Sequence, residues 1–264
     1  MGEITRQDDL ALLHHALDAA GEVAMAHFRA PSSHWYKGPG QVLTEADLAV
    51  DRLLQEILLG ARPGDGWLSE ETADDGSRHR CRRLWVVDPI DGTRAFADRL
   101  PEFAVSIGLL VDGQPVLGGL LNPATGERFV AIADESATLD GQPLRPSGCT
   151  RLEGARLLSA RTEMRRRNWP ATFPEASFAS VSSLAYKLAL VAAGRFDGLV
   201  SLRRCWDWDL AAALPLLEEA GCLATDARGD PLALNGATVK HHGLAIAATP
   251  ALHRALLERL ATVA

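Results

Sequence analysis

The chain has 264 residues, of which 47% are hydrophobic and 23% charged, and its formal net charge is −7. This length allows one large domain or two tightly joined halves around a sizeable core. An acidic chain is a poor candidate for binding the backbone of DNA or RNA, although a bound divalent cation could still attract a phosphorylated metabolite.

The four cysteines form no C-x-x-C pair, so we expect reduced thiols rather than a zinc site or disulfides. The first ten residues are polar and acidic and do not resemble a signal peptide. No apolar run approaches the roughly 18 residues of a membrane span. These features predict a cytoplasmic protein without a membrane or a nucleic acid polymer as partner.

Two helices are expected near the start of the chain. Apolar residues recur at helical spacing from Leu10 to Phe28 and predict an amphipathic helix. Residues 31–40 are rich in Pro, Gly and Ser and predict a loop. A second helix is expected from Thr44 to the breaker sequence Arg62-Pro63-Gly64.

Strand-like runs then dominate up to about residue 140. Short apolar stretches at 66–68 and 84–87 each run into carboxylates, with a charged loop at 74–83 between them. Three further runs lie within 104–133 and are separated by turn sequences, which predicts an antiparallel meander.

The pattern changes to alternating strands and helices after about residue 140. The expected strands are 155–160, 197–202 and 244–248, and the expected helices are 183–193, 210–220 and 251–262. We therefore expect two halves, an α+β half at 1–140 that carries most of the carboxylate motifs, and an α/β half at 141–264.

Two carboxylates, Asp88 and Asp91, end the apolar run that starts at Trp85. Buried carboxylates are costly unless cations pair with them, so two at one strand end form a cradle for a hard cation. Pro89 would stiffen the turn and hold the Ile90 carbonyl outward as a further oxygen ligand. The alternative is an ordinary β-turn, in which Asp-Pro and Asp-Gly are common.

The residues after this turn suggest a phosphate site. Gly92 lets the backbone approach a ligand closely, and a helix beginning near Thr93 would point its free amide groups at a phosphate.

Three more acidic clusters lie where apolar elements start or stop. In isolation, Glu70-Glu71 is typical of an exposed loop, Asp209 of a helix N-cap, and Thr44 with Asp47 of a capping box. Four such clusters without an adjacent run of Lys or Arg instead predict one oxygen-rich, histidine-poor site. Such a site favours Mg²⁺ or Mn²⁺ over Zn²⁺. No Ser-His-Asp, G-x-S-x-G or P-loop signature offers a different chemistry.

These motifs together resemble those of the inositol monophosphatase family, within the lithium-sensitive phosphatase superfamily. The run from Asp88 to Thr93, with Trp85 before it and Phe96 after it, resembles the family's core motif. Glu70-Glu71 resembles its Glu-Glu motif, and 208–212 its C-terminal Trp-Asp signature. Thr44 to Asp47 matches its Thr-x-x-Asp. Four motifs in the family's order, between about Leu10 and Leu260, are highly specific.

The resemblance implies a layered α-β-α-β-α sandwich, of the type shared with fructose-1,6-bisphosphatase, that binds two or three Mg²⁺ ions per subunit, with Mn²⁺ as a substitute. It implies that Glu70, Asp88 and the Ile90 carbonyl hold the first metal. It further implies that Asp88, Asp91 and Asp209 hold the second.

The resemblance also implies how the remaining motif residues act on a phosphate monoester. Glu70 and Asp47 would position a weaker third ion through water. Thr93, oriented by Asp47, would help to deprotonate the attacking water. The backbone amides of Gly92 and Thr93 would hold phosphate oxygens.

The substrate is expected to be a small phosphorylated metabolite of one of several classes. Leu202 stands seven residues before Asp209, where inositol phosphatases carry a Glu that binds sugar hydroxyls. The runs 66–72 and 206–209 look closer to the 3′(2′),5′-bisphosphate nucleotidase-like bacterial branch, and a histidinol-phosphatase-like role stays open. The candidate substrate contacts are Ser159 and three arginines that could bind a second phosphate or form a solvated rim: Arg94, Arg203 and Arg204.

On the resemblance alone we also expect a homodimer and inhibition by Li⁺. A different class of function is a non-catalytic binding partner of a larger assembly, such as the transcription apparatus. The intact set of metal-binding carboxylates argues against a purely structural protein, because clustered carboxylates are costly to keep without a cation.

Overall fold

The computed structural model describes residues 5–30, 34–38 and 41–262. Its helices are α1 (Arg6–Arg29), α2 (Glu45–Ala61), α3 (Thr93–Ala97), α4 (Arg161–Arg167), α5 (Trp169–Thr172), α6 (Leu184–Ala192), α7 (Asp207–Leu210), α8 (Ala213–Glu219) and α9 (Pro250–Leu260), with a 3₁₀ turn η1 (Ser77–Arg80). Its strands are β1 (His34–Gly38), β2 (Gln41–Thr44), β3 (Gly66–Ser69), β4 (Arg83–Asp91), β5 (Ala104–Val111), β6 (Gln114–Asn122), β7 (Glu127–Ile132), β8 (Ser136–Leu139), β9 (Gln142–Pro143), β10 (Arg156–Leu158), β11 (Ser177–Ala179), β12 (Gly198–Trp206), β13 (Leu223–Thr225) and β14 (Lys240–Ala247).

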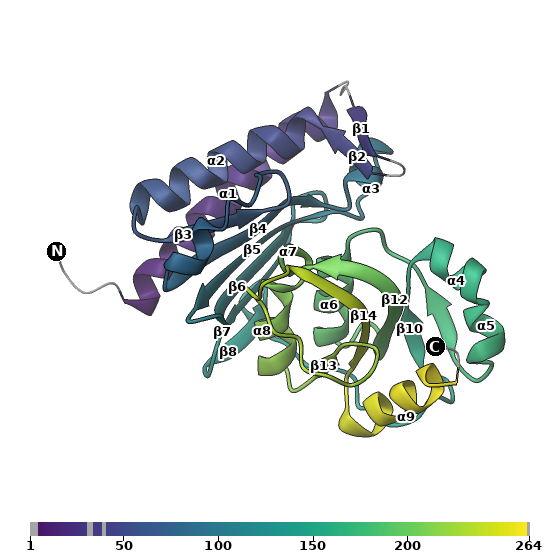
Figure 1. Ribbon diagram of the computed structural model, residues 1–264. Coiled ribbons are helices and arrows are strands. Elements are labelled where there is room, and N and C mark those ends of the chain that lie inside the picture. Colours follow the sequence, from purple (N-terminus) through teal and green to yellow (C-terminus); the bar gives the residue numbers. More distant parts are fainter. Residues whose placement is uncertain (1–4, 31–33, 39–40, 263–264) are drawn as a thin grey trace.

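The strands from β3 onward form two sheets (Figure 1). The seven-stranded sheet has the order β3-β4-β5-β6-β7-β8-β9 and is antiparallel except where β3 pairs with β4. The five-stranded sheet has the order β11-β10-β12-β14-β13 and is mixed, with β10 parallel to both of its neighbours. A separate hairpin of β1 and β2 precedes α2.

The helices and sheets form five layers, and three apolar cores lie between them (Figure 1). The helices α1 and α2 pack on one face of the seven-stranded sheet, with Leu17 and Leu54 among their buried contacts. The helices α6 and α8 fill the space between the two sheets. The helix α9 covers the outer face of the five-stranded sheet through Leu252 and Leu256. The predicted α-β-α-β-α sandwich is therefore confirmed.

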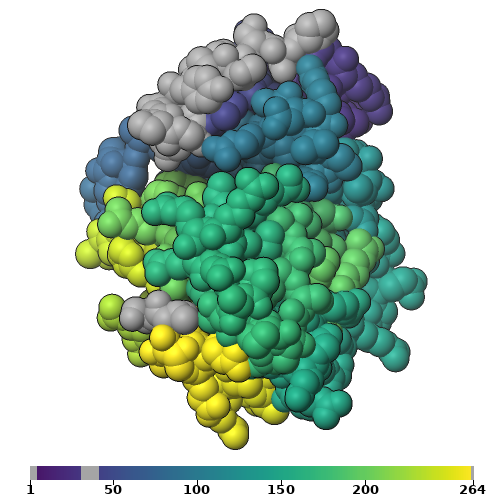
Figure 2. All heavy atoms as spheres, turned by 90° about the vertical axis from the view of Figure 1, so that its right-hand side faces the viewer, coloured from purple at the N-terminus to yellow at the C-terminus, as the bar shows by residue number. Residues whose placement is uncertain are grey.

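The two sheets share one core rather than meeting across a solvent gap. Leu84 and Phe129 of the first sheet and Leu199 and Ile246 of the second belong to the same buried cluster, which α6 completes. In the space-filling view, the green second half lies directly against the blue part of the first half (Figure 2).

The structure differs from the sequence predictions in several places, among them the strands expected at 197–202 and 244–248, which are observed as the longer β12 and β14. The expected loop at 31–40 is wrong for its described part, because residues 34–38 form β1; residues 31–33 and 39–40 lie outside the described residues. The expected strand at 84–87 continues to Asp91 as β4. The expected helix at 210–220 begins earlier, at Asp207, and is divided into α7 and α8 at Ala211 and Ala212. Several short elements were not predicted: β8, β9, β11, β13, α4 and α5.

Two glycines let the junction of α7 and α8 lie directly on the seven-stranded sheet. A Cβ on Gly118 of β6 would lie 2.2 Å from the Ala212 carbonyl oxygen, and one on Gly108 of β5 would lie 2.7 Å from Ala211. Real Cβ atoms do not approach backbone this closely, so the layer spacing depends on these residues. The same contact sets the height of α7 above the strands.

Replacing Gly118 with Ala is therefore expected to lower the free energy of unfolding by about 1–3 kcal/mol, the range typical of overpacking. Gly60→Ala is the matched control, because Gly60 is exposed near the end of α2 and a Cβ there meets nothing within 4 Å. It should leave stability unchanged or raise it slightly. Urea unfolding of both variants measures the difference, and equal stabilities would contradict the packing argument.

Candidate functional site

A bulge in β4 brings two carboxylates to one side of the strand. Asp88 pairs with Ser106 and Asp91 with Ala104, so three steps on β4 face two steps on β5. In a regular strand, residues three apart point to opposite faces. The extra residue corrects this, as bulges beside active sites commonly do. The Ile90 amide donates to Asp88 Oδ1 at 3.1 Å and fixes the turn.

The turn after Asp91 needs a glycine. Gly92 has φ +94°, and a Cβ there would lie 2.7 Å from the Glu102 carbonyl oxygen. The chain then enters α3 at Thr93, as expected.

Asp91 is held by the start of α6, which comes from the second half of the chain. Its Oδ2 accepts hydrogen bonds from the Ser183 hydroxyl at 2.7 Å and from the Ala185 amide at 2.6 Å. Ser183 is also the N-cap of α6, because its hydroxyl accepts from the Tyr186 amide. The helix cap and the carboxylate are thus one hydrogen-bonded unit.

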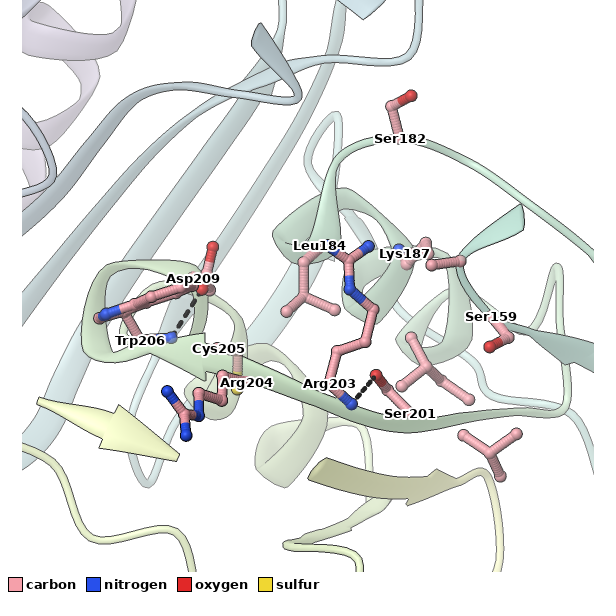
Figure 3. A pocket seen from close by; sticks show the side chains of 13 residues that line it. Ser159, Ser182, Leu184, Lys187, Ser201, Arg203, Arg204, Cys205, Trp206 and Asp209 are labelled. Carbon is pink, nitrogen blue, oxygen red and sulfur yellow. Dashed lines mark hydrogen bonds between the residues drawn. The ribbon is translucent and has the colours of Figure 1, made fainter. Parts of the chain in front are cut away.

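Asp209 completes a cluster with the two carboxylates of β4. Oxygen atoms of Asp88, Asp91 and Asp209 all lie within 4.8 Å of one another. Asp209 is the third residue of α7 and not its N-cap, so the N-cap interpretation is wrong in its position. Its Oδ2 nevertheless accepts from the Trp206 amide at 2.7 Å, which closes the first turn of the helix (Figure 3).

The electrostatics of this cluster fit a hard cation. Burial, followed by the charges of Glu70 and Asp91, raises the pKa of Asp88 well above its usual range. Burial and the charge of Asp91 raise the pKa of Asp209 likewise, and burial raises that of Asp91 despite its hydrogen bonds. Carboxylates that disfavour their own charged form, and offer only oxygen atoms, match the ligand preference of Mg²⁺.

Asp47 makes a contact of each kind that the sequence interpretation raised, one within the capping box and one with Thr93. Its Oδ2 accepts from the Thr44 amide at 2.7 Å and from the Thr44 hydroxyl at 2.6 Å, so the capping box of α2 exists. Its Oδ1 accepts from the Thr93 hydroxyl at 3.1 Å, which joins α2 to the start of α3. The Thr93 hydroxyl also lies 3.0 Å from the Ile90 carbonyl oxygen.

Glu70 lies at the edge of the cluster. Its amide donates to the Val87 carbonyl at 3.3 Å, so the end of β3 stays beside β4. Its carboxylate is near enough to raise the pKa of Asp88. Among the described residues, however, the set within 4.8 Å contains Asp88, Asp91 and Asp209 and not Glu70.

The sequence interpretation missed Asp51, which supports the loop that carries Glu70. Asp51 is buried on α2, and its carboxylate accepts from the Ser69 hydroxyl and, at 2.8 Å, from the Thr72 hydroxyl. These two residues flank Glu70 and Glu71. The available signal was the spacing from Asp47 to Asp51, which places both on one face of a helix.

A side cavity of about 180 Å³ opens beside Asp209 (Figure 3). Its lining includes three of the four predicted substrate contacts, Ser159, Arg203 and Arg204, but not Arg94. Ser159 is buried and accepts from the Trp169 indole at 3.0 Å. The lining also includes Lys187, which the sequence interpretation did not single out.

The comparisons with known proteins agree with this arrangement. The model of the inositol monophosphatase family matches residues 6–264. The chain belongs to the inositol monophosphatase family. Inositol-1-monophosphatase of Rhizobium meliloti (strain 1021) is 36% identical to it over 201 residues, 73% of this chain and 75% of that protein. Nus factor SuhB of Escherichia coli (strain K12) is 32% identical over 205 residues, 73% of this chain and 74% of that protein.

A solved structure, the IMPase of Thermotoga maritima, superposes with a TM-score of 0.85 at 25% identity and covers 98% of both chains. Members of the inositol monophosphatase family are metal-dependent phosphoric monoester hydrolases, so this chain is a phosphatase of that family. None of the helices in the described part of the chain is long and apolar enough to cross a membrane.

The raised pKa values predict how pH affects the metal-free protein. A carboxyl group whose pKa is higher in the folded than in the unfolded state favours folding below the unfolded pKa. That contribution is lost as the pH rises through the folded pKa. In EDTA, wild type should therefore lose stability relative to Asp209→Asn as the pH is raised from about 4, the unfolded value. Mg²⁺ should reverse the order, because it binds the folded wild type.

Urea unfolding at several pH values, with EDTA or with Mg²⁺, measures this difference. A wild-type advantage that grows with pH in EDTA would contradict the assignment.

Proposed function

We propose that this protein is a Mg²⁺-dependent phosphomonoesterase that hydrolyses a small phosphorylated metabolite with water. The observation that carries the proposal is the convergence of Asp88, Asp91 and Asp209 within 4.8 Å, on elements that lie far apart in sequence. An all-oxygen, histidine-free cluster favours Mg²⁺ over Zn²⁺, with Mn²⁺ as a substitute.

The proposed ligands follow the family motifs. Glu70, Asp88 and the Ile90 carbonyl would hold one ion, and Asp88, Asp91 and Asp209 the other. When bound, the ions would lower the pKa of the attacking water and stabilise the leaving alkoxide.

The remaining residues would position the reactants and move one proton. The Thr93 hydroxyl would accept the proton of the attacking water while it donates its own to Asp47, which already accepts that hydrogen bond. The backbone amides of Gly92 and Thr93 would hold oxygens of the phosphate. Asp47 and Glu70 would position a weaker third ion through water.

The substrate is proposed within three classes. The name of the Rhizobium meliloti relative favours inositol phosphate, whereas Leu202 stands at the sequence position where inositol phosphatases carry the Glu that binds sugar hydroxyls. The cationic cavity beside Asp209 favours a 3′(2′),5′-bisphosphate nucleotidase-like activity, with histidinol phosphate as the third class. A comparison of kcat/KM for inositol 1-phosphate, histidinol phosphate, adenosine 3′,5′-bisphosphate and fructose 1,6-bisphosphate tests which of these classes the protein prefers.

The name of the Escherichia coli relative, a Nus factor, supports a second proposal of another class, a binding partner of a larger assembly. Turnover of a generic phosphomonoester with Mg²⁺ and none with EDTA would separate the enzyme from a purely non-catalytic protein. We also propose, on the family resemblance, that the protein forms a homodimer. A monomer mass by light scattering at micromolar concentration would contradict the dimer.

Asp209→Asn is expected to lower kcat at least about 100-fold, because the variant lacks one negative charge that the second ion needs. The variant should remain folded, since Asn can still accept from the Trp206 amide. Circular dichroism and Mg²⁺-dependent turnover of p-nitrophenyl phosphate measure the two effects.

Asp230→Asn is the matched control, since Asp230 is exposed and lies outside the cluster. Asp207, although closer in sequence, is unsuitable: it is fully buried, and its carboxylate contacts His241 and the Asn235 amide. Near-normal kcat in Asp209→Asn would refute the role of this residue as a metal ligand.

Activity should require Mg²⁺, and Ca²⁺ should inhibit, because Ca²⁺ prefers more ligands at longer distances and is the weaker Lewis acid. Li⁺ should inhibit by occupying the second metal site. Metal titration of EDTA-treated protein measures all three effects, and full activity in the metal-free state would refute the proposal.

A further inference from the structure

A buried lysine lies in the side cavity next to the carboxylate cluster. Lys187 is only 5% exposed, on a helix whose other residues are almost all apolar, and it contributes to the cavity lining. Among the described residues, no hydrogen bond or ion pair involves its ammonium group. Figure 3 shows this group opening onto the cavity beside the guanidinium of Arg203.

Taking a cation out of bulk water is costly, although the ammonium group of Lys187 still opens onto the cavity. Burial lowers the pKa of Lys187, while the charges of Asp91, Asp209 and Glu163 oppose this effect. Arg203 adds a second positive charge at short range, which further lowers that pKa. Two cations that face one cavity, neither with a side-chain partner in the described part of the chain, suit an anion that binds and dissociates.

The backbone that precedes Arg203 is held by a buried carboxylate on another element. Glu163 of α4 is 4% exposed and accepts from the Ser201 hydroxyl at 2.9 Å and from the Leu202 amide. The register of β12 shifts at this point, between Ser201 and Arg204, and the Arg203 amide donates to the Ser201 hydroxyl at 3.1 Å. The Arg203 side chain therefore leaves a fixed bulge.

The same contacts engage the Glu163 carboxylate beside this part of β12, and no carboxylate stands at position 202. Leu202 is apolar, and both oxygens of Glu163 already accept hydrogen bonds from β12. A cavity of about 180 Å³ is smaller than the clefts of about 300–1,000 Å³ that hold whole drug-sized ligands, so it fits one small group.

We propose that Lys187 and Arg203 bind a second anionic group of the substrate, a phosphate or a carboxylate, while the scissile phosphate lies at the carboxylate cluster. The inference rests on the proposed phosphatase function and names its substrate class: small phosphate esters that carry a further anion. Polyol monophosphates, which carry no second anionic group, leave Lys187 without an anionic partner and are the poorer substrates.

The test compares three pairs of substrates that differ in one anionic group. Adenosine 3′,5′-bisphosphate is set against adenosine 3′-phosphate, and fructose 1,6-bisphosphate against fructose 1-phosphate. The third pair, 2-phosphoglycerate against glycerol 2-phosphate, examines a carboxylate. Wild type should have the higher kcat/KM for the member with two anionic groups in at least one pair. The pair that shows this preference identifies the second group as phosphate or carboxylate.

Lys187→Met removes the charge and keeps the length of the side chain. It should lower kcat/KM for the preferred substrate with two anionic groups roughly 10- to 100-fold, the effect of losing a hydrogen bond to a charged group. For the member of the pair with a single phosphate, kcat/KM should change less than about threefold, because this compound has no second anion to contact Lys187. Lys187→Arg should restore part of the loss. The melting temperature of the metal-free variant should be unchanged or higher, because a buried charge is gone.

Arg203→Gln is the second variant, on an exposed side chain whose loss does not disturb the core. It should reduce the same preference even if Lys187→Met does not fold. Arg254→Gln, an exposed change on α9, controls for net charge and should leave the preference intact.

Three outcomes overturn the inference: no wild-type preference for a second anion, equal losses on both members of a pair, or a preference that survives both variants. An equal loss together with a lower melting temperature would instead assign Lys187 to charge compensation of the carboxylates. Failure of the proposed function itself differs from all of these, because wild type would then hydrolyse no substrate with Mg²⁺.

Discussion

Mutual repulsion among three carboxylates is the constraint around which this structure is built. Asp88, Asp91 and Asp209 lie within 4.8 Å of one another, in surroundings that raise the pKa of each. Such a cluster does not form for its own stability, because like charges destabilise one another when water is excluded. Packing elsewhere must therefore hold the three side chains together until a cation neutralises them. The glycines of β5 and β6 serve this end, since they let α7 approach the sheet.

Contacts between the two halves set the spacing of the cluster. The bonds from Ser183 and Ala185 to Asp91 join the start of α6 to the end of β4. On another side, buried Arg78 of η1 contacts the Asn235 side chain and donates to the Gly236 carbonyl at 3.2 Å. These residues are not among the proposed metal ligands. They still act on the chemistry, because a shift of about 1 Å between the halves would separate ligands that reside on different elements.

The sequence predicted those parts of the site that depend on local patterns. Asp88 and Asp91 were found because an apolar strand runs directly into them, and Asp47 because capping boxes have a fixed spacing. The helix expected from residue 210 begins three residues earlier, at Asp207, because α7 has only four residues and no periodicity of its own. The Pro, Gly and Ser residues around β1 predict a loop, because they are typical of turns.

Lys187 was invisible to sequence patterns for a different reason. A single lysine on a helix is usually exposed, and only the packing of α6 between two sheets shows that this one is buried. Glu163 was missed likewise, because its contacts with β12 join residues 38 and 39 positions apart in the chain. Long-range docking decides such positions, and no local rule encodes it.

The carboxylate cluster and the side cavity with Lys187 affect each other through their charges. Without a metal, the carboxylates of Asp91 and Asp209 attract the positive charge of Lys187. Once cations neutralise these carboxylates, that attraction weakens and the side cavity becomes more cationic. A substrate with one phosphate satisfies the metal side and leaves Lys187 buried without a partner. A substrate with a second anion satisfies both. Leaving a buried charged group unpaired is among the strongest ways in which a site discriminates between ligands. Selection therefore arises less from the interactions that a substrate with two anionic groups gains. It arises more from the unpaired ammonium group of Lys187 that every substrate with a single phosphate leaves behind.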